Sequence, residues 1–468
     1  MQFAENTPYD VLTEKWEPVL GHEALPSIQD DYRKKVTAVL LENQEQAMRT
    51  QYLTEDMGGN ANLGGPSTSS LYNQGKVSGY DPVLISLVRR SMPNLMAYDI
   101  CGVQPMTAPT GLIFAMRSNY QFGGTPGASY GAAGYVEAMF QEPQPSYGGS
   151  GWTLGAFAAS KGLSAGWNYA SGITPASIDA IRGILTENGE AIGKNSPYAN
   201  WNQMAFSIDR VAVQARTRAL SSNYTVELAQ DLKAVHGLDA EAELANLLST
   251  EILAEINREI VKTIYHVAKK GSVQKDLNTA GGGVYDLDVD SDGRWSAERF
   301  RGLSFQIERE CNQIAKETRR GRGNFIICDS DTAAALAMSG FMSLSPAIAP
   351  QLNVDDTQST FAGVLSGKIR VYIDPYSPAG YNFFVTGYKG ESPYDAGIFY
   401  CPYVPLQMVR AVDPNTFQPR IAFKTRYGVV ANPFVLNNNA QPDGETLTTG
   451  LNQYYRLTAV TSLHGNTI

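Results

Sequence analysis

One long amphipathic helix constrains the fold of this chain more than any other feature. Between Asp239 and Lys270 the apolar residues recur at three- and four-residue steps and form one stripe: Leu244, Leu247, Leu248, Ile252, Ile256, Ile260 and Ile264. Asp239 is a suitable N-cap, while Lys269, Lys270 and Gly271 are typical of a helix C-terminus. At 1.5 Å per residue the helix is about 45 Å long. A single stripe over that length predicts a structural spine.

The chain after this helix mixes helical and strand patterns. Arg299 to Thr318 predicts an amphipathic helix, and NFIICDS followed by DTAAALAMSG predicts a buried strand leading into a helix capped by Asp329, Ser330 or Asp331. Further strands are predicted in KIRVYID, YNFFVTGY, GIFYCPY, RIAFKTRYGVVANP and YYRLTAV. A sheet flanked by helices gives an α+β fold class.

Residues 1–55 differ from the rest of the chain. A polar opening precedes a helical pattern from about Asp30 to Tyr52, and a flexible, polar Gly- and Ser-rich stretch follows at residues 58–70. The segment holds ten acidic and five basic residues, a net charge of -5, so its removal changes the formal charge of -9 to about -4. We expect a detachable acidic arm.

Residues 121–203 also differ in composition from their surroundings. Before them, a helical pattern limited by Pro93 is followed by a strand from Gly111 to Arg117. The segment itself is rich in Gly, Ser, Ala and Tyr, carries Trp152 and Trp167 among turn signals, and has one helical pattern near residues 177–185. We expect a small inserted domain or an elaborated loop.

The segment FSIDRVAVQARTRAL predicts one long strand with a basic face. Val211, Val213, Ala215 and Ala219 alternate with Arg210, Gln214, Arg216 and Arg218. Such a row is usually solvated or ion-paired, and nucleic-acid contact is the alternative. Because the chain is acidic overall, carboxylates of a neighbouring subunit are the favoured partners. The candidate inter-subunit contacts are therefore Arg210, Arg216, Arg218, Trp152 and Trp167.

An Asp-rich segment has the appearance of a calcium-binding loop. Asp288, Asp290 and Asp292 alternate before a glycine, as in an EF-hand. The twelfth loop position, however, is Arg299, where a bidentate acid is required, and no convincing helix enters the loop. The pattern favours an Asp-rich turn and leaves a calcium site as the alternative.

Other motifs give no support for an enzyme, a metal site or a cofactor. GGGVY at Gly281 and RRGRG at Arg319 lack the spacing of phosphate-binding loops, and the four histidines are scattered. The four cysteines form no CxxC pair, so buried free thiols are expected. No apolar run reaches the length of a membrane span and the N-terminus does not resemble a signal peptide, which predicts a chain made and kept in a cytoplasm.

Three stretches suggest a family. PVLISLVRRSMPNLMAYDICGVQPMTAPTGLIFAMRSNY resembles the start of the mature domain in major capsid proteins of T-even-type myoviruses. AFSIDRVAVQARTRALSSNYTVELAQDLKAVHGLDAEAELANLLSTEILAEINREIV and DLDVDSDGRW extend the resemblance over most of the chain beyond residue 55. It implies the Hong Kong 97-type capsid fold, in which a spine helix crosses a peripheral domain, an extended hairpin reaches a neighbour, and an axial domain meets its symmetry mates.

The resemblance also implies a domain division. The expected parts are an N-terminal propeptide at 1–55, an N-arm and the start of the peripheral domain at 56–100, an extended loop at 101–225 with the insertion domain at about 121–203, the peripheral domain with the spine helix at 226–274, the axial domain at 275–433, and a C-terminal return segment at 434–468. The insertion expected from composition thus coincides with the insertion domain of the family.

The implied function is structural. The chain is expected to form hexamers in the icosahedral shell of the virion, assembled in the host cytoplasm, which encloses DNA without sequence-specific binding. The implied partners are other copies of the chain, a scaffolding core, a prohead protease, vertex and portal proteins, and decoration proteins. A vertex-forming paralogue is the alternative within the family, and a calcium-dependent glycan-binding protein is the alternative from another class.

Members of the family are cleaved after a Leu/Ile-x-Glu sequence by the prohead protease. Leu53, Thr54 and Glu55 fit that pattern, which also occurs at residues 12–14, 40–42, 185–187 and 253–255. The last of these lies within the predicted spine helix, whereas Glu55 precedes the glycine-rich stretch that a protease can bind in extended form. The resemblance therefore predicts cleavage between Glu55 and Asp56.

Overall fold

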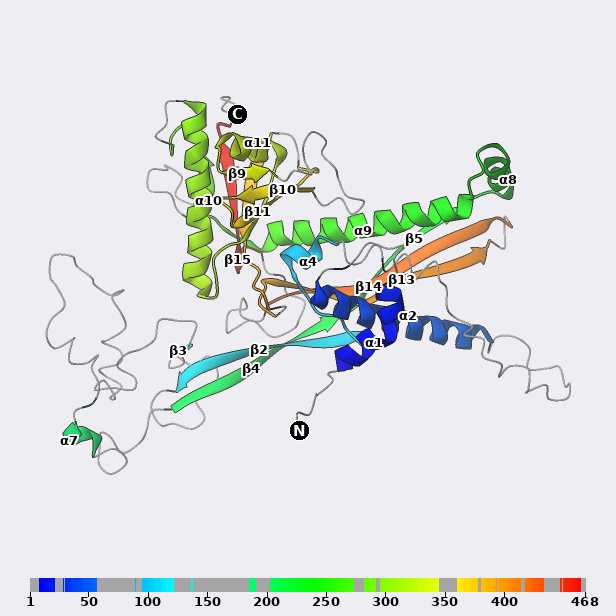
Figure 1. Cartoon of the computed structure of the whole chain (residues 1–468), viewed down its shortest axis with the longest axis horizontal. Coiled ribbons are helices and arrows are strands. Elements are labelled where there is room, and N and C mark those ends of the chain that lie inside the picture. Colours follow the sequence, from blue (N-terminus) through cyan, green and yellow to red (C-terminus); the bar gives the residue numbers. More distant parts are fainter. Residues whose placement is uncertain are drawn as a thin grey trace.

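The computed structural model contains one long helix and three sheets, one of which projects away from the helix as a hairpin (Figure 1). It describes residues 8–21, 28, 30–56, 89, 95–121, 136–137, 184, 186–190, 203–272, 282–291, 295–344, 360–377, 380–392, 394–413, 417–432, 447 and 449–463. The predicted helix near residues 177–185, apart from residue 184, the break at Pro93, and both Trp152 and Trp167 fall outside these ranges.

The spine helix is present as α9 (Ala240–Val267). The Asp239 side chain accepts a hydrogen bond from the backbone N–H of Glu241 at 3.1 Å, so the predicted N-cap is confirmed. The predicted C-terminus is wrong, because Lys269 and Lys270 belong to strand β6 (Ala268–Lys270), which pairs in parallel with the last strand of the chain. The stripe is buried at Leu248, Ile252, Ile256, Ile260 and Ile264, while Leu247 is 63% exposed.

A four-stranded sheet lies along α9. It contains β1 (Gly102–Val103), β5 (Arg216–Asn223), β13 (Ile398–Val412) and β14 (Pro419–Ala431), with α8 (Val226–Val235) beyond the N-terminus of α9. The apolar face of α9 and the inner residues of this sheet belong to the same hydrophobic core, which explains why one stripe suffices for so long a helix.

The second half of the chain forms a larger mixed sheet. Its strands are β6, β7 (Val284–Asp286), β8 (Phe325–Cys328), β9 (Met342–Leu344), β10 (Thr360–Leu365), β11 (Ile369–Ile373), β12 (Asn382–Gly387) and β15 (Asn452–Thr461). Helices α10 (Ser296–Thr318) and α11 (Ser330–Met338) pack on this sheet around a second core. All strands predicted in this half are found, and the α+β class is confirmed.

A long hairpin projects from the body of the molecule (Figure 1). Strands β2 (Thr110–Gln121) and β4 (Gln203–Gln214) pair antiparallel along their whole length, and the short β3 (Val136–Glu137) pairs with β2. The spine helix and the extended hairpin of the Hong Kong 97-type fold are thus both present.

The predicted single strand through FSIDRVAVQARTRAL is wrong. The chain divides at Ala215, whose N–H donates to the carbonyl of Pro109 at 2.9 Å, and it passes from the hairpin into the sheet beside α9. The buried face changes with the division, since Val211 and Val213 are buried but Ala219 is exposed. Periodicity cannot reveal this because the alternation itself continues across the junction.

The N-terminal segment is folded onto the body. The predicted helix is found as α2 (Asp31–Asp56), and an additional helix that was not predicted, α1 (Pro8–Leu20), packs against it. Lys15 of α1 pairs with Glu42 and Glu45 of α2 at 2.5 and 2.8 Å. A further single-turn helix, α4 (Ala97–Ile100), lies between α2 and the spine, and α7 (Thr186–Gly189) is distant from the body.

Candidate assembly interface

The β2–β4 hairpin presents an exposed apolar face. Leu112 and Phe114 on β2 are 51% and 58% exposed, and Met204, Phe206 and Ile208 on β4 are 54%, 69% and 57% exposed. These positions share one face, because they alternate along each strand and residues paired across an antiparallel ladder point to the same side. We refer to these five residues as the hairpin face.

The opposite side of the hairpin anchors it to the body. Near the root, Ile113, Val211 and Val213 are at most 3% exposed and pack with a small core that includes Phe399 and Cys401 of β13. The hairpin is therefore fixed at its root, while its other side leaves large apolar side chains in contact with water. A contiguous apolar surface of this kind is typical of a protein contact site.

The three candidate arginines do not form one face. Arg210 is exposed on the hairpin, directly opposite Phe114, and no carboxylate among the described residues pairs with it. Arg218 instead bonds within its own chain, to Glu255 at 2.8 Å and Glu259 at 2.6 Å on α9. For Arg218, the expectation of carboxylate partners on a neighbouring subunit is therefore wrong. Its partners lie in its own chain, because β5 lies against α9. Arg216, at the start of β5, is exposed.

The Asp-rich segment forms the turn between β7 and α10. Asp290 accepts from the N–H of Asp286 at 2.9 Å, and the Asp286 carboxylate accepts from the N–H of Asp288 at 3.0 Å. Arg299 pairs with Asp288. Asp292 lies outside the described residues, and the residues that are described contain no cluster of three or more metal-ligating side chains. These contacts show how the carboxylates fix the turn.

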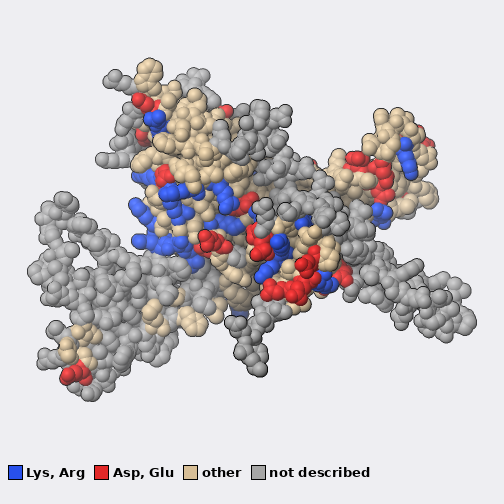
Figure 2. Space-filling model, in the orientation of Figure 1, with Lys and Arg blue, Asp and Glu red and all other residues tan. Residues whose placement is uncertain are grey.

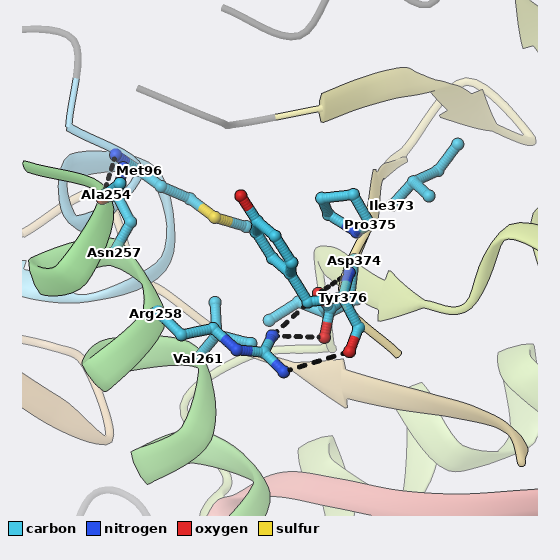
Figure 3. Close-up of a pocket in the computed structure, with 10 residues that line it drawn as sticks. Met96, Ala254, Asn257, Arg258, Val261, Ile373, Asp374, Pro375 and Tyr376 are labelled. Atoms are coloured by element: carbon cyan, nitrogen blue, oxygen red, sulfur yellow. Dashed lines mark hydrogen bonds and ion pairs between the residues drawn. The ribbon is translucent and has the colours of Figure 1, made fainter. Parts of the chain in front are cut away.

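A buried ion pair joins the spine helix to the larger sheet (Figure 3). Asp374, which follows β11 and has a side chain only 3% exposed, accepts from Arg258 at 2.8 and 2.7 Å, from the Tyr265 hydroxyl at 2.9 Å and from the N–H of Tyr376 at 3.0 Å. Burial, reinforced by the charge of Asp374, raises the pKa of Tyr265. The adjoining cavity of about 30 Å³ has room for a water molecule.

This joint could not be predicted from the sequence, because its two charged members lie 116 positions apart. Asn257, the neighbour of Arg258, extends the joint by accepting a hydrogen bond from the N–H of Met96 at 3.3 Å, as Figure 3 shows. An aspartate immediately after a buried strand is the only local signal. The arrangement positions α9, α4 and the larger sheet relative to one another.

Basic side chains gather over the region of α10, and acidic ones gather over the N-terminal helices (Figure 2). The RRGRG motif ends α10, with Arg319 in the left-handed conformation at φ 56°. Arg320 approaches Asp395 at 3.4 Å and Arg322 pairs with Glu308. The motif is a helix stop, and its Arg320 and Arg322 side chains bond to nearby carboxylates.

All four cysteines are buried and free, as predicted. Burial raises the pKa of Cys101, Cys311 and Cys401 to about 12 and raises that of Cys328 as well. The thiols are therefore protonated at neutral pH, and the reactive thiolate form is scarce.

These features define a class of protein. Charged groups are buried where they join structural elements, and an exposed apolar surface lies on a projecting hairpin, as expected for a subunit that neighbouring chains complete. No described helix is both long and apolar enough to cross a membrane.

The chain belongs to the Gp23 major capsid protein family, whose model matches residues 77–460. It is 38% identical to the major capsid protein of Escherichia phage AR1 and 37% identical to that of Enterobacteria phage T4, in each case over 94% of both chains. It is 31% identical to the capsid vertex protein of phage T4, over 49% of this chain and 53% of that one.

Among solved structures, the capsid of Myoviridae phage XM1 matches with a TM-score of 0.36 and 7% identity, over 77% of this chain and 90% of that one.

Proposed function

We propose that the chain is the major shell subunit of a T4-like phage head and forms hexamers in an icosahedral shell around DNA. The observation that carries the proposal is the hairpin face, which is anchored by its opposite side and covered by no described part of its own chain. The similarity to major capsid proteins over 94% of both chains supports this function over that of the vertex paralogue. No enzymatic activity is proposed.

The size of the hairpin face suits a repeated contact. Fully burying one large apolar side chain contributes about 1.5–3 kcal/mol, and these side chains are only half to two-thirds exposed. Covering all five would contribute about 5 kcal/mol. Two-body association costs about 4–15 kcal/mol in lost freedom, so a single contact is weak. In a closed shell, symmetry repeats this contact many times, so the contacts together stabilise the shell strongly.

We also propose the domain division that the family resemblance implies. The spine helix α9 belongs to a peripheral domain at 226–274, the larger sheet with α10 and α11 makes up most of an axial domain at 275–433, and the hairpin carries an insertion domain at about 121–203. A separate hydrophobic core beneath α10 and α11 supports an axial part, whereas β13 and β14 pack along α9 and share its core. Trp152, Trp167, Arg210 and Arg216 remain proposed contacts to neighbouring subunits.

Maturation is proposed to occur by cleavage between Glu55 and Asp56. Leu53, Thr54, Glu55 and Asp56 form the C-terminal end of α2, so the end of this helix must unwind before a protease can bind it in extended form. The proposed partners are a prohead protease, a scaffolding core, vertex and portal proteins, and decoration proteins. Mass spectrometry of virion protein is the direct test, and an intact 1–55 segment in mature particles contradicts the proposal.

Electron microscopy of the chain co-expressed with a phage scaffold and a chaperonin tests the shell function. We expect closed shells, tubes or sheets of hexamers from the native chain, and their loss in Phe206→Asp, which places a charge on the hairpin face. Phe305→Asp is the matched control, because Phe305 is 71% exposed on α10, away from the hairpin. A soluble monomer from the native chain under all conditions, or equal assembly by both variants, contradicts the proposal.

A further inference from the structure

Helices α1 and α2 form a unit that is separable from the body of the chain. Lys35 of α2 pairs with Asp10 of α1 at 2.9 Å, in addition to the ion pairs of Lys15, so the two helices hold each other. Among the described residues, no strand pairing and no backbone–backbone hydrogen bond joins residues 8–56 to the rest of the chain. We refer to α1 and α2 together as the helix pair.

Side chains fasten the helix pair to the body from both directions. Asn43 of α2 donates to the carbonyls of Met106 and Tyr403 at 2.7 and 2.9 Å. Arg89, which belongs to the body, is 1% exposed and donates to the carbonyl of Leu20 at the end of α1 at 2.8 Å. Each side therefore supplies donors for acceptors of the other, as the two partners of a complex do.

The helix pair also supplies part of the hydrophobic core of the body. Val36, Leu40 and Leu41 of α2 are at most 2% exposed. They share one core with Ile100 of α4 and Leu406 of β13, and the apolar stripe of α9 belongs to the same core. The core around α9 and β13 is therefore complete only while the helix pair is in place.

One residue of α2 weakens this contact. Gln44 lies one helical turn after Leu40 and is 0% exposed, and neither its Nε2 nor its Oε1 has a hydrogen-bond partner among the described residues. Burying an amide without a partner costs free energy, which is recovered when the group returns to water. An apolar residue at this position would hold the helix pair more tightly. The amide of Gln44 thus favours a partner that can leave.

We propose that the helix pair is a detachable folding partner of the body. It completes the core around α9 and β13 while the chain folds, and it leaves after contacts between copies in the shell stabilise the body. This role rests on the arm removal proposed above. While the helix pair is covalently attached, its effective concentration at the body is high, so it stays bound during folding. A cut ends that advantage, and the unpaired amide of Gln44 then favours release.

An introduced cut tests the partnership in the full chain. A specific protease sequence is inserted after Asp56, the folded chain is cut at a concentration too low for shells, and hydrogen exchange is followed by mass spectrometry. With the helix pair still bound, we expect the exchange of the uncut chain. After chromatography removes the fragment 1–56, exchange in residues 95–106 and 398–408 should rise at least about tenfold, because their core has lost several buried side chains.

Two comparisons complete this experiment. Residues 303–314 of α10 lie in the second core and should remain protected, while fragment 1–56 added back should restore protection in residues 95–106 and 398–408. Unchanged exchange in those two segments after the fragment has left overturns the folding role, because the body is then complete without the helix pair. Failure of the added fragment to restore protection overturns it as well.

Gln44→Leu tests whether the helix pair is built to leave. In the cut chain, release of fragment 1–56 should be about tenfold slower than with the native sequence, because leucine removes the unpaired amide from the contact. Gln230→Leu, the same substitution at an exposed position of α8, is the control and should not change the rate. Equal or faster release in Gln44→Leu, or a fragment that never leaves the cut native chain on dilution, overturns the detachable partner.

The outcomes separate the folding role from the shell function, because every readout is taken on unassembled protein. If shells form but removal of the helix pair leaves the exchange of the body unchanged, the folding role is wrong while the shell function stands. If the exchange and release follow the expectations but no shells form, the shell function is wrong while the helix pair remains a folding partner.

Discussion

Replacing Asp374 with asparagine perturbs the joint between the spine helix and the larger sheet with almost no change in shape. Asp374 is the common acceptor for Arg258, Tyr265 and the N–H of Tyr376. In Asp374→Asn the negative charge disappears and one acceptor oxygen becomes a donor. Arg258 then lacks its ionic partner, and one of the donors facing Asp374 meets an NH₂ group in place of an acceptor.

The expected cost follows from the burial of the two partners. Breaking a fully buried ion pair costs about 3–5 kcal/mol. The Arg258 side chain is 27% exposed, so water stabilises its charge in part, and the amide oxygen still accepts one bond. We therefore expect a loss of about 2 kcal/mol, which corresponds to about a thirtyfold increase in local opening.

Hydrogen exchange followed by mass spectrometry measures this opening in peptides that cover residues 254–265 and 369–376. Asp31→Asn is the matched control, because Asp31 is 90% exposed and its ion pair with Lys34 at 3.5 Å is typical of pairs that contribute little. A change below about threefold in Asp374→Asn, or an equal change in the control, would refute the view that this ion pair holds the joint together.

Three further outcomes are expected. Ile256 on α9 is 0% exposed, so Ile256→Ala should lower the free energy of unfolding, measured in urea, by about 2–5 kcal/mol. Leu247→Ala on the exposed side of the same helix should lower it by less than about 0.5 kcal/mol. Similar losses in the two variants would contradict the packing described. Gly387→Ala places a Cβ 2.2 Å from the buried Phe325 ring and should lower the unfolding midpoint clearly, while Gly189→Ala, with open space around it, should not. The buried thiols should resist a thiol reagent at pH 8 and all four should react after denaturation; a fast-reacting thiol in the native protein would be inconsistent with their raised pKa values.

The sequence predicts elements whose signal is local. The stripe of α9, the N-cap at Asp239 and the strands of the second half all depend on neighbouring residues, and these predictions are confirmed. The end of α9 was predicted wrongly because pairing with β15 overrides the helix-stop signal of Lys269, Lys270 and Gly271. Tertiary pairing of this kind leaves no trace in local periodicity.

In the candidate interface, too, only the features encoded by neighbouring residues could be predicted. Alternation indicated the strand that carries Arg210 and Arg218, but not that a division at Ala215 sends one to the hairpin and the other to α9. The Arg258–Asp374 joint depends on residues far apart in sequence, so no pattern predicts it. The apolar hairpin face also required the pairing of β2 with β4, strands that are more than 80 residues apart.

The division at Ala215 has a mechanical consequence. Strand β4 is 12 residues long, about 40 Å when extended, and only one residue separates it from β5. Because Arg218 of β5 bonds to Glu255 and Glu259, a force applied to the distant tip of the hairpin is transmitted through Ala215 to the middle of α9. The hairpin thus acts as a lever. If a neighbouring copy in a shell holds the hairpin tip and is displaced, the spine helix of the copy that owns the hairpin would bend.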